Sequence, residues 1–89
     1  MPNALLEAMA AGLAVIVNDA SPGPLEFVTD GQNGLVVPHD DAAALARAML
    51  RLQTDPQLRI RLGLAAQDRL KTQDWPVLEP IWKAALAME

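Results

Sequence analysis

The sequence predicts an α/β fold in which short parallel strands alternate with helices, as in a piece of a doubly wound parallel sheet. Two apolar runs, Leu13–Val17 and Leu35–Val37, consist of aliphatic and largely β-branched residues, which is typical of strands covered on both faces. Helical patterns lie before, between and after these runs. Two strands are too few for an independent sheet, so the 89 residues are expected to belong to a larger domain.

The first helix is expected over Asn3–Ala11. Asn3 is a favoured N-cap residue, and Gly12 supplies the stop because glycine tolerates the left-handed conformation found after many helices. The strand Leu13–Val17 should follow directly, which gives the order of a helix and then a buried strand.

Turn-forming residues surround the second strand. Asn18–Pro24 is rich in Asp, Ser, Pro and Gly and is expected to be a loop, whose last proline begins a short helix over Leu25–Val28. Thr29–Gly34 should form a turn before the strand Leu35–Val37. The proline that follows ends this strand because it lacks an amide donor.

Two longer amphipathic helices are predicted next. Asp40 is placed to cap a helix over Asp41–Gln53, and Asp55-Pro56 starts a second helix that ends near Lys71. Gly63 should weaken the second helix by roughly 1 kcal/mol relative to alanine. The inner stripe of the first helix is expected to be Leu45, Ala48, Met49 and Leu52, and that of the second Leu58, Leu62, Ala65, Ala66 and Leu70.

The C-terminal segment contains a third helix start. Asp74-Trp75-Pro76 resembles a cap followed by a first turn, and Pro80 should kink or restart the helix that leads to Met88. Trp75 and Trp82 are expected to anchor this segment.

Composition and charge exclude several classes of function. Apolar residues make up 52% of the chain, enough for a core, and the formal net charge of −4 disfavours nucleic acid and anionic lipid as partners. The absence of cysteine removes disulfides, thiolate metal sites and cysteine nucleophiles. The longest apolar run, Ala8–Val17, is well short of the roughly 20 residues that a membrane span needs.

The polar residues, when each is considered alone, do not predict a catalytic or metal-binding site. His39 lies in a polar loop and is expected to be exposed and structural. Asp40 and Asp41 could hold a magnesium ion, but helix capping accounts for both, so no metal site is assigned. Ser21 has no neighbouring base in the sequence, and a serine nucleophile is not expected.

Five segments of the chain together resemble a known family. They are Pro2–Ile16, Ser21–Val28, Asp30–Pro38, Ala44–Ala46 and Asp55–Arg59. In this order and at this spacing they resemble the donor-nucleotide region of the group-1 retaining glycosyltransferases, which have the GT-B fold. The resemblance covers roughly residues 2–72 and implies a Rossmann-like domain with three α/β/α layers.

The family signature is a pair of glutamates at a fixed spacing, and Glu7 matches the second of them. The first glutamate would fall just before Met1, outside this chain. The resemblance therefore implies that residues 1–89 are part of the nucleotide-sugar-binding C-terminal domain of a longer parent enzyme. The N-terminal acceptor domain and the first signature glutamate would lie elsewhere in that enzyme.

A helix N-terminus suits the chemistry of this region. Its unpaired amides and positive dipole end favour a diphosphate, and a carboxylate one turn into the helix can accept two hydrogen bonds from a ribose diol. The amides of Asn3, Ala4 and Leu5 would point out of the helix start. The resemblance implies that these amides lie near the donor diphosphate and that Glu7 binds the ribose.

The activity implied by the resemblance is the retaining transfer of a hexosyl group from a nucleotide diphosphate sugar to an acceptor hydroxyl. The resemblance implies no cofactor and no metal, and no catalytic residue is assigned within this chain. We expect the isolated chain to be inactive. The parent enzyme is expected in the cytoplasm, with a peripheral position at the inner face of the membrane left open.

A second function of a different class remains open. The chain would then be a non-catalytic interaction module that forms a homodimer, using an unpaired sheet edge and the apolar face of its C-terminal helices. A coding sequence that continues upstream into the first part of the glutamate signature favours the enzyme, whereas an upstream stop codon favours the module.

Overall fold

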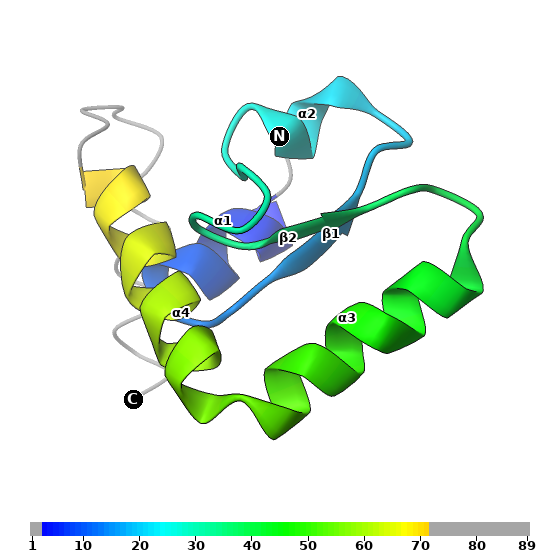
Figure 1. Ribbon diagram of the computed structural model, residues 1–89. Helices are drawn as coiled ribbons and strands as arrows, with labels where there is room; N and C mark the ends of the chain where they lie inside the picture. The colour runs from blue at the N-terminus through cyan, green and yellow to red at the C-terminus, as the bar shows by residue number, and fades with distance from the viewer. Residues whose placement is uncertain (1–2, 72–89) are drawn as a thin grey trace.

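The computed structural model describes residues 3–71 and consists of two parallel strands packed between helices (Figure 1). This confirms the α/β class and the layered arrangement. The elements, in chain order, are α1 (Asn3–Ala10), β1 (Ile16–Asn18), α2 (Pro22–Leu25), β2 (Leu35–Val37), α3 (Ala42–Thr54) and α4 (Pro56–Lys71). The predicted helix start at Asp74, the kink at Pro80 and the anchors Trp75 and Trp82 lie outside the described residues.

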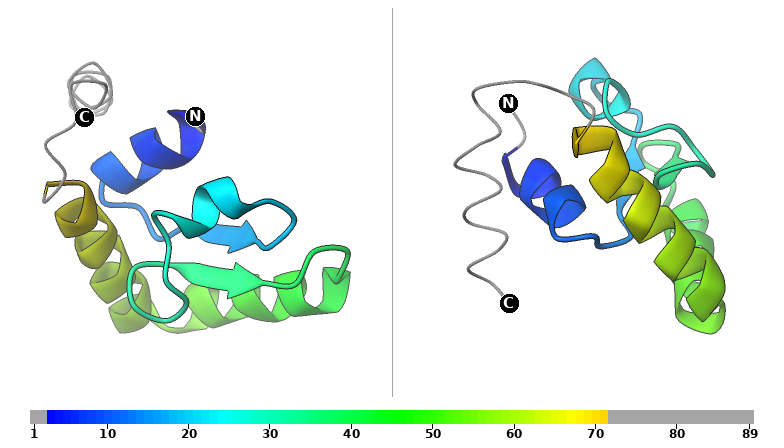
Figure 2. Two further views of the ribbon diagram at one scale, coloured as in Figure 1. Left: turned by 90° about the horizontal axis from the view of Figure 1, so that it is seen from above. Right: turned by 90° about the vertical axis from the view of Figure 1, so that its left-hand side faces the viewer.

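The sheet separates two hydrophobic clusters. β1 and β2 pair in parallel, with Val17 opposite Val36. α1 lies on one side of the strands and α3 on the other (Figure 2), while α4 packs against both helices. The cluster beside α1 contains Leu6, Met9, Ala10, Val15, Phe27, Val28, Ala66 and Leu70, and the cluster beside α3 contains Leu35, Val37, Ala44, Ala48, Leu52, Leu58 and Leu62.

The end of α1 is a Schellman motif centred on a glycine. Gly12 has a φ of 78°, its N–H donates to the carbonyl of Met9, and the N–H of Leu13 donates to the carbonyl of Ala8. The prediction that Gly12 stops this helix is confirmed. The predicted start of the strand at Leu13 is wrong, because this motif uses the Leu13 amide and leaves the side chain 52% exposed, so β1 begins at Ile16.

The short helix after β1 begins earlier than predicted. α2 starts at Pro22 rather than Leu25, since proline suits the first helical position, where the missing N–H would have had no partner. Phe27 and Val28, expected inside the helix, instead follow it. Both of their amides donate to the carbonyl of Pro24, and both side chains are buried.

The turn predicted at Thr29–Gly34 is present and is organised by a buried asparagine. Asn33 is 6% exposed, its side-chain N–H donates to the carbonyl of Phe27, and its side-chain oxygen accepts from the N–H of Thr29, both at 2.7 Å. The turn residues thus find partners for the polar groups that they bury. β2 then follows at Leu35, as predicted.

α3 begins one residue later than predicted and has a different cap. The carboxylate of Asp41 accepts from the N–H of Ala44 at 2.9 Å, so Asp41 is the N-cap. Asp40 does not cap the helix and has a φ of 56°, in the left-handed region. The expectation that capping accounts for both aspartates is therefore wrong for Asp40.

The buried stripe of α3 also differs from the prediction. Ala44, Ala48 and Leu52 face the core, whereas Leu45 and Met49 are 43% and 57% exposed. The predicted and observed stripes are neighbouring apolar rows that share Ala48 and Leu52, so the sequence pattern alone could not choose between them. Packing on the sheet selects the row of small alanines because it lets the helix approach the strands closely.

α4 buries the residues expected of it, except that Ala65 is only half-buried. Leu58, Leu62, Ala66 and Leu70 face the core. Gly63 is also buried, against the backbone of Gly12. The interpretation of Gly63 as a simple weak point is therefore incomplete, because this close approach leaves no space for a side chain.

Candidate functional site at the carboxyl end of the strands

The start of α1 and the carboxyl ends of both strands lie at the same end of the molecule. α1 runs in the direction opposite to β1, so its N-terminus is beside the end towards which the strand arrows point (Figure 2). In open α/β sheets this end is where ligands bind. The structure thus places the predicted donor-nucleotide residues at the end of the sheet that suits a ligand.

The first turn of α1 contains the predicted diphosphate-binding amides. Asn3, Ala4 and Leu5 are its first described residues. Amides in a first helical turn have no partner within the helix and point outward along its axis. Ala4 is exposed and Leu5 is half-buried, so the turn is open to solvent at Ala4.

Glu7 lies one turn further into α1 and is half-buried. Within residues 3–71 its carboxylate takes part in no ion pair and no hydrogen bond. The neighbouring Leu6 is fully buried, which fixes this part of the helix against the core. The helix therefore holds Glu7 in place, and its carboxylate has no partner among the described residues.

Packing holds α1 firmly in place. Met9 and Ala10 are buried, and the side-chain amide of Gln67 on α4 donates to the carbonyl of Ala10 at 3.0 Å. This contact links the C-terminal turn of α1 to a helix far along the chain. The position of the first turn is thus set by the core rather than by local sequence.

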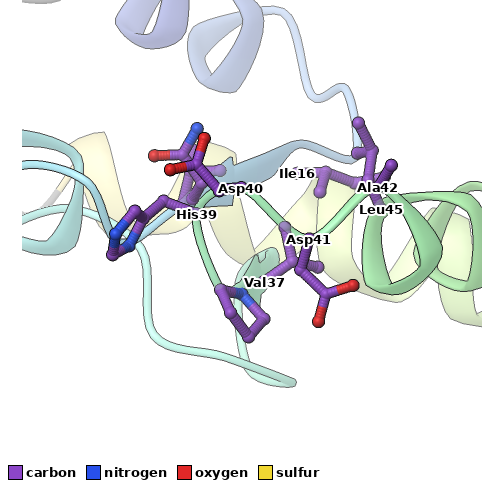
Figure 3. Close-up of a pocket in the computed structure, with 10 residues that line it drawn as sticks. Ile16, Val37, His39, Asp40, Asp41, Ala42 and Leu45 are labelled. Atoms are coloured by element: carbon purple, nitrogen blue, oxygen red, sulfur yellow. The ribbon is translucent and has the colours of Figure 1, made fainter.

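A cavity of about 540 Å³ opens between the carboxyl ends of the strands and the start of α3 (Figure 3). Ile16, Val37 and Leu45 form apolar parts of its lining, and Asn18 and Asp41 are among its polar residues. Sequence reasoning did not identify this cavity. The sequence feature that could have indicated it is that polar loops follow two neighbouring parallel strands at the same edge of the sheet, where ligands bind in open α/β sheets.

His39 and Asp19 join the loops that follow the two strands. One carboxylate oxygen of Asp19 accepts from the backbone N–H of His39 and lies 2.7 Å from its Nδ1, and the backbone bond is also 2.7 Å long. These contacts, the side-chain hydrogen bond first, hold the pKa of Asp19 below its ordinary value. His39 is exposed, as the sequence predicted, and its contact with Asp19 was not foreseen.

The two glycines near these loops have different environments. A Cβ on Gly34 would lie 2.7 Å from a methyl carbon of Val28 and 3.0 Å from one of Val15, so Gly34 is needed for packing. A Cβ on Gly23 would meet no atom within 4 Å. The fold alone therefore does not require glycine at position 23.

These features define a class of protein. Parallel strands with helices on both faces, and a helix N-terminus at the carboxyl end of the sheet, make this a piece of a Rossmann-like α/β domain. Residues 1–69 match the model of the family described as glycosyl transferases group 1. The chain belongs to this family.

Curated relatives support the same assignment. The chain is 39% identical over 74 residues to a phosphatidyl-myo-inositol mannosyltransferase of Mycolicibacterium smegmatis, covering 83% of this chain and 19% of that protein. It is 41% identical over 71 residues to the lipopolysaccharide core biosynthesis glycosyltransferase LpsE of Rhizobium meliloti, covering 80% and 21%. A D-inositol 3-phosphate glycosyltransferase of Streptomyces bingchenggensis is 37% identical over 70 residues, covering 79% and 15%. The chain thus spans about a fifth of the length of these relatives or less.

The helices of the described part are too short or too polar to be membrane spans. Within residues 3–71, no helix combines the length and the apolar character needed to cross a bilayer.

Proposed function

We propose that this chain forms part of the donor-nucleotide site of a retaining hexosyltransferase, which uses a nucleotide diphosphate sugar and an acceptor hydroxyl. The observation that carries the proposal is the carboxylate of Glu7, which has no partner within residues 3–71 and lies one turn into a helix whose N-terminus is at the carboxyl end of the strands. Membership of the group-1 glycosyltransferases supports this proposal.

Each part of α1 has a role in the proposed site. The amides of Asn3, Ala4 and Leu5 donate to the diphosphate, and the positive end of the helix dipole adds to this attraction. Glu7 accepts hydrogen bonds from both hydroxyls of the ribose. The diphosphate is thereby held at the helix end and the nucleoside along its first turns.

The short helix α2, which follows β1 in the chain, supports the same proposal. Gly23 follows the β1 strand end, and the space where its side chain would lie is empty of protein atoms. Glycine is common where a ligand approaches the backbone closely. We assign Gly23 to the part of α2 that faces the bound donor.

Positioning and electrostatics are the catalytic contributions of this region. In the transfer, the bond between the anomeric carbon and the diphosphate oxygen breaks. A bond to the acceptor oxygen forms on the same face of the sugar, and the hydroxyl proton of the acceptor passes to an oxygen of the leaving diphosphate. Negative charge then builds up on the leaving diphosphate, and preorganised amides at the start of α1 stabilise it.

The isolated chain is expected to bind a donor nucleotide weakly and to transfer no sugar. It spans about a fifth of the length of its curated relatives, and the proposal places the acceptor domain in the remaining part. Multiple turnovers of any nucleotide sugar by the purified chain would contradict this proposal.

A binding titration tests the site assignment. Nucleoside diphosphates are titrated into the chain by NMR, with Glu7→Gln as the variant and Glu26→Gln as the control, since Glu26 is exposed on the C-cap of α2. We expect shifts at the amides of the first turn of α1 and weaker binding in Glu7→Gln alone. Equal loss in both variants, or shifts confined to other elements, would show that the site is elsewhere.

Self-association is the second candidate function. Within residues 3–71 the sheet has two strands, so β1 and β2 each have an outer edge without a strand partner. We propose that two copies of the isolated chain pair as a two-fold dimer. A monomer mass by light scattering over a wide concentration range would count against this dimer.

A further inference from the structure

The cavity at the carboxyl ends of β1 and β2 is separate from the donor site proposed on α1. Its volume of about 540 Å³ lies within the range of roughly 300–1,000 Å³ that is usual for small-molecule sites. α1 and α3 lie on opposite sides of the strands (Figure 2), and Ala42 and Leu45 line the cavity from the α3 side. The cavity and the donor site therefore lie at the same end of the sheet without sharing a residue.

The charge of the cavity lining disfavours an anionic ligand. Asp40 and Asp41 line the cavity, whereas none of its described lining residues is a lysine or an arginine. A phosphate or a nucleotide would be repelled there, with no cation to offset the repulsion. Residues 3–71 also hold no group of three acidic, histidine or cysteine side chains suited to a metal ion. The lining thus favours an uncharged ligand.

Hydrogen-bonding groups of both kinds line the cavity. The side-chain oxygen of Asn18 accepts from the N–H of Ala20 at 2.9 Å, which leaves the side-chain N–H groups of Asn18 as donors. One carboxylate oxygen of Asp41 accepts from the N–H of Ala44, and the other has no partner within residues 3–71. The carboxylate of Asp40 has no partner within the same residues. Hydroxyl groups, which both donate and accept, match this set.

A contact between two loops holds the rim of the cavity in place. One oxygen of Asp19 accepts from the backbone N–H of His39 and lies 2.7 Å from its Nδ1, so the loops after β1 and β2 are joined. Because an ionised carboxylate only accepts, Nδ1 carries the hydrogen, and Nε2 of the neutral ring is a further acceptor. A site whose loops are already joined loses less conformational entropy when a ligand binds.

Aliphatic side chains from three elements form the apolar part of the lining (Figure 3). Ile16 on β1 is half-buried, Val37 on β2 is buried, and Leu45 on α3 is 43% exposed. A pyranose ring carries C–H groups as well as hydroxyls, and aliphatic side chains pack against such groups. The combination of apolar and hydrogen-bonding groups therefore suits a sugar ring better than a purely polar or a purely apolar molecule.

We propose that this cavity binds a neutral pyranose of the acceptor. The inference rests on the proposed function, which requires an acceptor hydroxyl, and it names the residues of this chain that recognise the acceptor. Sugar hydroxyls donate to the carboxylates of Asp40 and Asp41 and accept from the side-chain amide of Asn18. The C–H groups of the ring pack against Leu45. The chain then contributes to both substrates, to the nucleotide through α1 and to the acceptor sugar through the cavity.

An NMR titration with the chain as it stands tests the inference. Methyl α-mannopyranoside and methyl α-glucopyranoside are the probes, because each presents a single neutral pyranose. We expect saturable shifts at the amides of Asn18 and of residues 39–42 with at least one of them, and none at these amides with inorganic phosphate. Failure of both glycosides, or a response of these amides to phosphate or magnesium ions instead, would overturn the inference.

Asp40→Asn tests the polar part of the cavity and should weaken glycoside binding at least about tenfold, because a charge-assisted hydrogen bond is lost. Asparagine also adopts the positive φ of residue 40, so the loop should keep its conformation. Asp68→Asn is the control, since it removes the same charge at an exposed position of α4 that is not part of the lining. Equal affinity of the two variants would contradict the role of Asp40.

Leu45→Ala tests the apolar part and should weaken glycoside binding about fivefold, because less aliphatic surface is covered by the sugar. Met49→Ala is the matched control. Met49 lies one turn further along α3, is 57% exposed and does not line the cavity. The same loss in both variants would show that the glycoside does not contact Leu45 in the cavity.

Nucleoside diphosphate titrations separate this inference from the donor site. Asp40→Asn should leave the nucleotide shifts at the start of α1 unchanged, and Glu7→Gln should leave glycoside binding unchanged. A chain that binds the nucleotide at α1 but neither glycoside would overturn the assignment of the cavity alone. Glycoside binding in the cavity without a nucleotide response at α1 would support the sugar site and contradict the donor site.

Discussion

Gly63 on α4 lies so close to Gly12 that a methyl group at position 63 would overlap the Gly12 carbonyl oxygen. Gly12 itself ends α1 with a positive φ. The turn that stops the first helix is therefore also the surface on which the last described helix packs. Together with the bond from Gln67 to Ala10, this contact fixes the position of α1.

Gly63→Ala should destabilise the chain by about 1–3 kcal/mol, because the overlap is with backbone that cannot turn aside. Helix propensity alone predicts the opposite sign, a gain of roughly 1 kcal/mol. Urea unfolding measures the difference. Gly23→Ala is the control, since a Cβ there meets nothing within 4 Å. A more stable Gly63→Ala chain would show that α4 does not pack on Gly12 this closely.

Asn33→Ala should cost about 1–3 kcal/mol, because it removes both hydrogen bonds of a buried side chain, one to the carbonyl of Phe27 and one from the N–H of Thr29. Asn18→Ala serves for comparison. Asn18 is exposed and accepts from the N–H of Ala20, so water can replace its bond and the loss should be much smaller. Equal losses from the two substitutions, measured by chemical unfolding, would contradict the role given to Asn33.

Asp41→Ala should destabilise the chain by about 1 kcal/mol, since it removes the N-cap of α3. Asp40→Gly should be neutral or stabilising, because glycine adopts the positive φ of this residue without strain. Thermal unfolding of both variants distinguishes the two aspartates. A larger loss from Asp40→Gly than from Asp41→Ala would restore Asp40 as the cap.

His39→Ala should raise the pKa of Asp19 towards its ordinary value, because the side-chain hydrogen bond that lowers it is lost. A carboxylate with a lowered pKa in the folded state stabilises the fold above its unfolded pKa, and this stabilisation disappears as the pH falls through the folded pKa. The difference in stability between the two proteins should thus be present at neutral pH and vanish in acid. NMR titration of the Asp19 carboxyl checks the shift, and an unchanged titration would show that the contact is absent in solution.

In the full-length enzyme, Glu7→Ala should weaken donor binding about tenfold to a hundredfold, which corresponds to roughly 1.5–3 kcal/mol for charge-assisted hydrogen bonds to ribose. Stability should change by less than about 0.5 kcal/mol. A deoxyribose donor should bind the unaltered enzyme as weakly and lose little more with the variant, since both changes remove the same interaction. Unchanged affinity in calorimetry with a large fall in Tm would make Glu7 a structural residue.

Interactions between residues close in the chain were predictable from the sequence. Gly12 stops a helix through bonds to residues only a few positions away, and the strand Leu35–Val37 follows a turn formed by its immediate neighbours. The run around Glu7 indicated the glycosyltransferase family, which the match over residues 1–69 shows. The role of Glu7 in donor binding stays a prediction.

Packing between distant segments decided the rest. Two neighbouring rows of α3 are apolar in the sequence, and contact with the sheet buries the row with Ala44 while leaving Leu45 exposed. Gly63 has a helical pattern around it, but only the approach of α4 to Gly12 makes glycine necessary there. Asp19 and His39 meet because parallel pairing brings the ends of β1 and β2 together. Such contacts depend on the three-dimensional arrangement of the elements. Helix caps, turns and the repeat of apolar residues along a helix depend instead on residues within about one helical turn of each other.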